Sequence, residues 1–142
     1  MALYIPAHLK ERIIQADQGG CAYCQTNELN SGMPLTIDHI IPMSRNGETV
    51  FENLCLACRS CNQYNADHIH GEDPQTGEIA PLFNPRKDKW GNHFSWSADG
   101  TRIEGLTAKG RATVIVLRMN RSGIVGARSR WVIGGWHPPY KI

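Results

Sequence analysis

Two pairs of cysteines with the spacing Cys-x-x-Cys constrain this chain more than any other feature of its sequence. The pairs are Cys21/Cys24 and Cys58/Cys61. Zinc prefers four tetrahedral ligands, and two thiolates separated by two residues can span one edge of that tetrahedron. Two such pairs complete a closed site, so its metal would organise the fold and leave no open position for catalysis. The interval 25–57 exceeds the roughly 15–20 residues of a simple zinc ribbon, which leaves room for a strand pair.

Whether the cysteines bind metal or form disulfides depends on the compartment in which the chain resides. Residues 1–6 lack the basic segment and apolar run of a signal peptide, so we expect a cytoplasmic protein. No apolar run approaches the roughly 20 residues of a membrane span, and no membrane partner is expected. In a reducing compartment such pairs bind metal more often than they form disulfides, which remain the alternative together with unpaired buried thiols. Cys55 lies in an apolar segment, and we expect it to be a packed thiol and not a ligand.

Hydrophobic periodicity and turn residues predict an α+β chain. A strand, a loop, a second strand and a helix should lie inside the cysteine frame, with a helix before it and a hairpin plus two helices after it. Loops or turns are expected at 27–34, 45–47 and 73–77. The expected helices are 6–17, 58 to about 68, Thr107 to about Asn120 and Ser122 through Val132, and the expected strands are 35–39, 54–56, 93–96 and 101–104.

Charge is distributed unevenly along the chain. Residues 1–84 carry four Lys/Arg and ten Asp/Glu, a net of −6, whereas residues 85–142 carry eleven and three, a net of +8. A basic half suggests a polyanionic partner, although solvated surface charge is the alternative for any single side chain. The basic residues expected to contact phosphates are Arg86, Lys87, Lys89, Arg111, Arg118, Arg121, Arg128 and Arg130. Five aromatic side chains could stack on unpaired bases, but we favour a place in the core for them: Trp90, Phe94, Trp96, Trp131 and Trp136.

Three motifs occur in order: Cys21-Ala-Tyr-Cys24, Asp38-His39-Ile-Ile-Pro-Met-Ser44, and Asn53-Leu-Cys-Leu-Ala-Cys58-Arg-Ser-Cys61-Asn62. This order resembles the HNH endonuclease family in its zinc-stabilised form, over residues 21–62. The segment from Asp73 to Trp96 resembles the tail of small stand-alone bacterial members. The resemblance implies a ββα-metal fold that cleaves phosphodiester bonds with one divalent cation.

The residues between the cysteine pairs suit that chemistry. His39 can act as the general base, since imidazole titrates near neutral pH. Asp38 and Asn62 offer oxygen ligands to Mg²⁺ or Mn²⁺, although Asp38 could instead orient His39 and Asn62 could instead cap a helix. Neighbours on a regular strand point to opposite faces, so the strand must bend or end near Asp38 and His39 if both are to serve one phosphate.

Three further polar residues enter the expected site. Asn53 is expected to hold the loop that carries His39 by hydrogen bonds. His68 could supplement or replace Asn62 at the catalytic metal. Asn65 stands where the family often has a lysine, and Asn46-Gly47 stands in place of a paired glycine. Both departures from the family pattern affect the expected contacts with phosphate and leave the expected reaction class unchanged.

These features predict two parts: an HNH nuclease core with structural zinc at 1–72, and a basic extension at 73–142 packed on or next to it. The expected activity is hydrolysis of DNA that leaves 5′-phosphate and 3′-hydroxyl ends. A monomer would nick one strand, and a homodimer would cut both. A non-catalytic zinc-knuckle module that binds nucleic acid is the alternative from another class, and RNA or a guided target is the alternative substrate.

Overall fold

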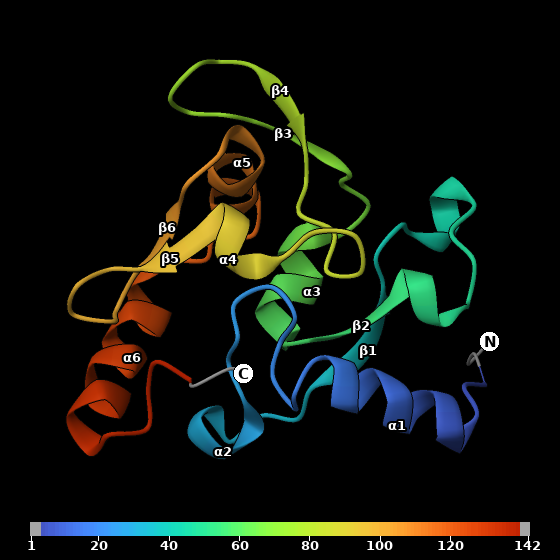
Figure 1. Ribbon diagram of the computed structural model, residues 1–142, viewed down its shortest axis with the longest axis horizontal. Helices are drawn as coiled ribbons and strands as arrows, with labels where there is room; N and C mark the ends of the chain where they lie inside the picture. The colour runs from blue at the N-terminus through green and yellow to red at the C-terminus, as the bar shows by residue number, and fades with distance from the viewer. Residues whose placement is uncertain (1–3, 140–142) are drawn as a thin grey trace.

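An antiparallel strand pair followed by a helix lies at the centre of the molecule (Figure 1). The computed structural model describes residues 4–139, so the expectation about residues 1–6 falls partly outside the described residues. β1 (Thr36–His39) pairs with β2 (Leu54–Ala57), and α3 (Arg59–Asn65) follows β2 almost directly. The predicted order of strand, loop, strand and helix is confirmed.

The first helix packs on the buried strand of this pair. α1 (Ala7–Ala16) buries Ile13 completely, and Ile13 forms a small apolar cluster with Leu54 and Leu56 of β2. All four residues of β2 are buried, whereas β1 is partly exposed. β1 therefore presents its side chains toward solvent while β2 anchors the pair.

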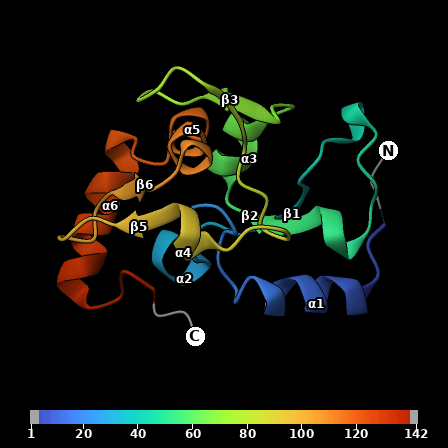
Figure 2. The same cartoon turned by 45° about the horizontal axis from the view of Figure 1, so that its top comes forward.

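The remaining elements are short and confirm the α+β class. The β3–β4 hairpin packs against α5, as the two views of the ribbon agree (Figures 1 and 2). No helix within residues 4–139 is both long enough and apolar enough to cross a membrane. These elements are α2 (Glu28–Ser31), η1 (Met43–Arg45), η2 (Phe51–Asn53), β3 (His70–Glu72), β4 (Ile79–Pro81), α4 (Trp90–His93), β5 (Phe94–Trp96), β6 (Ile103–Gly105), α5 (Ala108–Val116) and α6 (Ser122–Gly134).

One apolar core joins the two halves of the chain. Tyr23 and Cys55 from the first half belong to the same buried cluster as Phe83, Phe94 and Leu117 from the second. The extension therefore shares the core that surrounds the cysteines. A division into 1–72 and 73–142 stays a prediction.

Two ion pairs join the acidic residues 1–84 to the basic residues 85–142. Both nitrogens of the Arg86 fork bind the Asp17 carboxylate, at 2.8 and 2.9 Å, and Asp17 accepts a further hydrogen bond from the backbone of Leu56. Arg111 binds Asp73 in the same bidentate way, at 2.9 and 3.0 Å. Part of the charge asymmetry therefore reflects attraction within the molecule. Arg86 is engaged internally, which corrects the expectation that it contacts phosphate.

Two predicted helices are shorter than expected because the backbone leaves the helical region. α3 ends at Asn65, not near His68, since Ala66 takes φ 44° and ψ −119°. α5 ends at Val116, not near Asn120, and Arg118 takes a positive φ of 48°. The predicted cap of α5 is confirmed, because the Thr107 side chain accepts a hydrogen bond from the backbone of Gly110.

Several short elements escaped prediction. α2 lies within the expected loop 27–34 and is capped by Asn27, whose side chain accepts from Asn30 N. β3 and β4 flank the expected turn 73–77, and α4 precedes the expected hairpin. Ser122 is the first residue of α6 and not its cap, since the cap position is held by Arg121. Elements of three or four residues carry too little periodicity to be recognised.

Replacement of Arg86 by Leu tests the buried link between the halves. It would leave the Asp17 carboxylate charged and buried, because the side chains of this pair are only 9% and 5% exposed. We expect the free energy of unfolding in urea to fall by about 3–5 kcal/mol. A loss below about 1 kcal/mol would show that the pair does not hold the halves together.

Candidate active site and metal cluster

The four paired cysteines form one cluster. The sulfur atoms of Cys21, Cys24, Cys58 and Cys61 all lie within 4.8 Å of one another, and those of Cys24 and Cys58 are 3.7 Å apart. A tetrahedral zinc with Zn–S bonds of roughly 2.3 Å needs sulfur–sulfur separations of about 3.8 Å. All four thiols are free of disulfides. The cluster is therefore arranged for metal binding and is compatible with zinc.

Each pair is set by its local backbone. The first pair lies in a tight turn in which Gln25 N donates to Cys21 O, and Gln25 itself takes a positive φ of 64°. The second pair begins α3, because the Cys58 sulfur accepts a hydrogen bond from Cys61 N at 3.4 Å and so caps the helix. A cysteine at this cap position directs its sulfur toward the first turn of the helix.

Burial and mutual hydrogen bonding shift the pKa values of the cysteine thiols in opposite directions. The pKa of Cys24 and that of Cys58 are lowered, chiefly by a hydrogen bond with the Cys21 thiol. Burial raises the pKa of Cys21, and burial likewise raises the pKa of Cys55 to about 12. Cys55 is fully buried and stands outside the cluster, which confirms that it is a packed thiol.

The candidate catalytic pair lies at the end of β1. The strand stops at His39 and the backbone bends at Ile40 and Ile41, which meets the requirement that the strand end here. Asp38 Oδ1 accepts a hydrogen bond from the backbone N–H of His39 at 3.0 Å. Partial burial raises the pKa of the Asp38 carboxyl above its ordinary value, although the His39 N–H opposes this. A nearby cation would favour the carboxylate form.

Thr49 holds the ring of His39. Its Oγ1 lies 2.9 Å from His39 Nε2, within hydrogen-bond distance. Thr49 lies in the loop between β1 and β2, outside every motif of the sequence, and nothing in the pattern singled it out. It is a residue of the site that only the folded loop reveals.

Asn53 fastens the loop between the two strands. Its Oδ1 accepts from Ile41 N at 2.8 Å, and its Nδ2 donates to Ile41 O at 3.1 Å and Glu48 O at 2.9 Å. These are the bonds expected of a residue that holds the loop carrying His39. Gly47 is required beside them, since a Cβ there would overlap the Ile41 carbonyl and approach the Asn53 amide.

The other two expected metal ligands have different surroundings. Asn62 is half-buried on α3, and its side chain is not the cap, because Cys58 fills that role. Its amide makes no hydrogen bond with any residue in 4–139, so it is free to bind a ligand. His68 is exposed beyond the end of α3. Within the described residues, Asp38, His39 and His68 do not converge as a three-ligand group.

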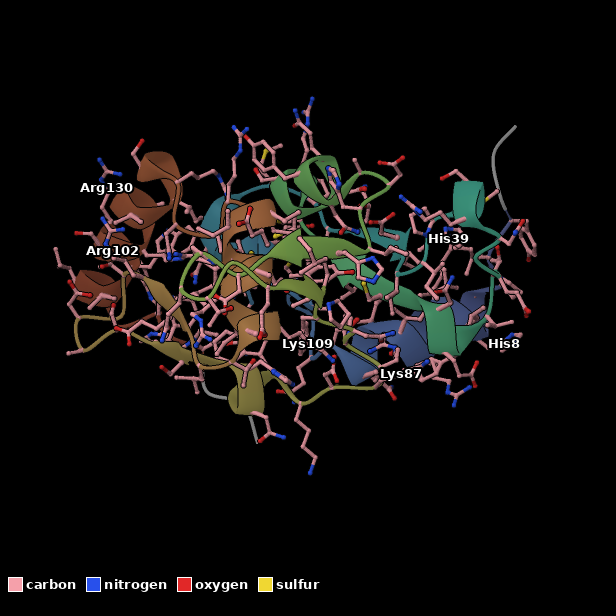
Figure 3. The ribbon with its side chains drawn as sticks, turned by 90° about the horizontal axis from the view of Figure 1, so that it is seen from above. His8, His39, Lys87, Arg102, Lys109 and Arg130 are labelled. Atoms are coloured by element: carbon pink, nitrogen blue, oxygen red, sulfur yellow. The ribbon has the colours of Figure 1, made fainter. Side chains whose placement is uncertain are left out.

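Several basic residues of the C-terminal half are used inside the protein. Arg128 is fully buried; its Nη1 donates to Thr101 O, and its guanidinium carbon lies 5.1 Å from the centre of the Trp96 ring. Burial lowers the pKa of this guanidinium. Arg128 and Arg111 are therefore engaged internally, which corrects their expected contact with phosphates. Arg130 lies at the opposite end of the molecule from His39 (Figure 3).

The aromatic residues mostly belong to the core. Phe94 and Trp131 are buried, and the Trp90 indole donates to Tyr23 O at 2.7 Å. Trp136 is the exception, being 65% exposed. The expected core position is confirmed for Phe94 and Trp131.

Comparison with known proteins bears on the same segment. Residues 21–68, about a third of the chain, match the family described as HNH endonuclease. This segment is similar to an HNH domain. It contains both cysteine pairs, Asp38-His39, Asn53 and Asn62, and it ends at His68. The HNH family suggests a nuclease-type function. No curated protein and no solved structure gives a significant match to the chain.

Metal content tests the cysteine cluster. We expect one zinc per chain by atomic absorption, and we expect chelation to melt the core, because structural zinc contributes roughly 10–16 kcal/mol against a typical stability of about 5–15 kcal/mol. Cys58→Ser should lose the zinc. Cys55→Ala is the matched control and should keep it; zinc loss from that control, or full retention by Cys58→Ser, would contradict the assignment of ligands.

Proposed function

We propose that this protein is a metal-dependent endonuclease that hydrolyses phosphodiester bonds of DNA. The observation that carries the proposal is the imidazole of His39, placed at the end of β1 inside an HNH domain and held by Thr49. The Asn53 bonds to Ile41 and Glu48 support it, since they hold in place the loop on which Thr49 lies.

His39 would serve as the general base. His39 can act as base in the tautomer in which Nε2–H donates to Thr49 Oγ1, because this leaves Nδ1 to accept a proton. Water attacks phosphorus as Nδ1 takes its proton, the bond from phosphorus to the 3′ oxygen breaks, and that oxygen gains a proton from solvent. The products are 5′-phosphate and 3′-hydroxyl ends.

Asp38 and Asn62 would hold the divalent cation. A carboxylate and a neutral amide oxygen are hard donors suited to Mg²⁺ or Mn²⁺, and His68 is a further candidate ligand. When bound, the cation neutralises the charge that develops on the phosphate and on the leaving oxygen. The four cysteines would hold a separate, structural zinc.

DNA would be bound by side chains that remain outside internal ion pairs. Lys87 and Lys89 are exposed and form no ion pair with any residue described in the structure. Such side chains neutralise phosphates without reading sequence, and they make binding sensitive to salt.

A single site would nick one strand, and a homodimer would cut both. We place the protein in the cytoplasm.

A supercoiled plasmid tests the activity. Purified protein with Mg²⁺ or Mn²⁺ should convert it to open-circular or linear DNA, with 5′-phosphates at the mapped ends, and EDTA should stop the reaction. His39→Ala should slow cleavage by about 10²–10⁴-fold, the usual contribution of a general base, while binding to DNA persists.

Two outcomes would contradict these assignments. Undiminished cutting by His39→Ala would remove His39 from the role of base. Binding without cleavage under every divalent cation would favour the non-catalytic nucleic-acid-binding module. RNA and single-stranded DNA, assayed beside the plasmid, decide the substrate.

Thr49 provides a separate test of the positioning of His39. Thr49→Val removes the hydroxyl at nearly constant volume, and we expect kcat to fall by about 5–50-fold as the ring loses its hydrogen bond, with a shifted pH–rate profile. Thr49→Ser keeps the hydroxyl and should retain most of the activity. Equal rates for the Val and Ser variants would show that the bond has no role.

A further inference from the structure

A cleft of about 310 Å³ opens beside the loop that follows β1. One wall is Ile40 and Ile41, the two residues that directly follow His39. The facing walls come from the segment after α3 and from the stretch that leads out of β4. We call this space the β1 cleft; the residues of it that matter here are Ile41, Asn65, His68, Leu82, Lys87 and Lys109.

Asn65 presents a polar side chain to the β1 cleft. Its side chain lines the cleft and the residue is only 3% exposed, yet its amide makes no hydrogen bond within residues 4–139. Within residues 4–139 the Asn65 amide is not among the buried side-chain atoms that lack a partner, so its atoms reach the cleft, where water or a ligand can bind them. An asparagine amide offers a donor and an acceptor together, which is the pattern that matches the edge of a nucleobase.

The charges in the β1 cleft favour an anion. Lys109 is bound to Asp88 at 2.9 and 3.0 Å, so these two side chains compensate each other. Lys87 lines the same space, is exposed, and forms no ion pair with any residue that the structure describes. Lys87 therefore contributes an uncompensated positive charge to the lining of the cleft. In the view from above, Lys87 and Lys109 lie on the same side of the molecule, with His39 above them and to their right (Figure 3).

The dimensions limit the occupant. A volume of about 310 Å³ is at the lower end of the roughly 300–1,000 Å³ of small-ligand sites. It has room for one nucleotide, and a base pair would not enter. Ile41 and Leu82 supply apolar surface for the face of a base, while Asn65 and Lys87 are placed for polar groups.

We propose that the β1 cleft binds one unpaired nucleotide of the substrate, next to the phosphate at His39. Asn65 pairs with the edge of the base and Lys87 binds its phosphate. This inference rests on the proposed nuclease function and specifies its substrate class: DNA with a single-stranded or unstacked nucleotide beside the cut. A duplex must then expose a nucleotide before cleavage, which is easiest at mismatches, gaps and flaps.

Binding measurements on the His39→Ala protein test the cleft apart from catalysis. The probes are thymidine 3′,5′-bisphosphate, followed by ¹⁵N NMR, and a fluorescent 12-nucleotide single strand compared with the same sequence as a duplex. The bisphosphate should shift the side-chain amide signals of Asn65. The single strand should bind more tightly than the duplex at equal salt.

Two substitutions locate the contacts. Asn65→Leu and Lys87→Gln should each weaken binding of the single strand by roughly 3- to 10-fold, the value of one hydrogen bond or charged contact. Asn65→Leu should leave the melting temperature unchanged or raised, because no internal hydrogen bond is lost. Lys10→Gln, on the exposed face of α1, is the matched charge control and should change binding by less than about twofold.

The outcomes separate the cleft from the nuclease proposal. If both cleft variants bind the single strand as tightly as the parent protein, or if the probe shifts only the signals of other residues, the proposed nucleotide site is wrong. Plasmid cleavage by the parent protein would still support the nuclease function in that case. An unshifted Asn65 amide would show that it meets water only, which also overturns the proposal. Probe binding in the cleft without any plasmid cleavage would instead refute the nuclease function.

Discussion

The contact among four thiols is the constraint on which the candidate site depends. It joins the turn after α1 to the start of α3, and the whole β1–loop–β2 segment lies between those two points. Without it, the order of the site would rest on two four-residue strands, which are marginal alone. A metal held by the four thiols closes a long loop, where cross-linking restricts the unfolded chain most. The cluster therefore fixes the segment that carries the candidate catalytic residues and would take no part in the proposed reaction itself.

The uneven distribution of charge along the chain also stabilises the fold through ion pairs between its acidic and basic halves. Asp17 and Asp73 of the acidic half hold Arg86 and Arg111 of the basic half in bidentate pairs, and the buried core is shared as well. Breaking one partner of such a pair would cost more than the pair contributes, because a charge would stay buried alone. Lys87 escapes this pairing, and the cationic character left for an external partner is concentrated in fewer side chains than the sequence suggested.

The loop between β1 and β2 is held by small, specific contacts. Asn53 bonds to Ile41 at the start of the loop and to Glu48 within it, a Cβ at Gly47 would collide with Ile41, and the Thr49 hydroxyl lies within hydrogen-bond distance of the ring of His39. The loop is thus fixed around the imidazole of His39, which would lower the reorganisation required by the proposed catalysis. In our proposal, the neighbouring cleft, with its Asn65 amide, extends this surface toward the adjoining nucleotide.

The sequence was sufficient for features that depend on spacing and residue type. Cys-x-x-Cys pairs, the two strands, α3 and the buried Cys55 follow from ligand geometry and hydrophobic pattern, and the place of Asn53 follows from its motif. Features that depend on which distant groups meet needed the tertiary structure. Local patterns cannot show that Arg86 reaches Asp17, that Arg128 is buried against Trp96, or that Thr49 lies beside His39. Those contacts are long-range or lie in irregular loops, where packing, and not periodicity, decides which side chains touch.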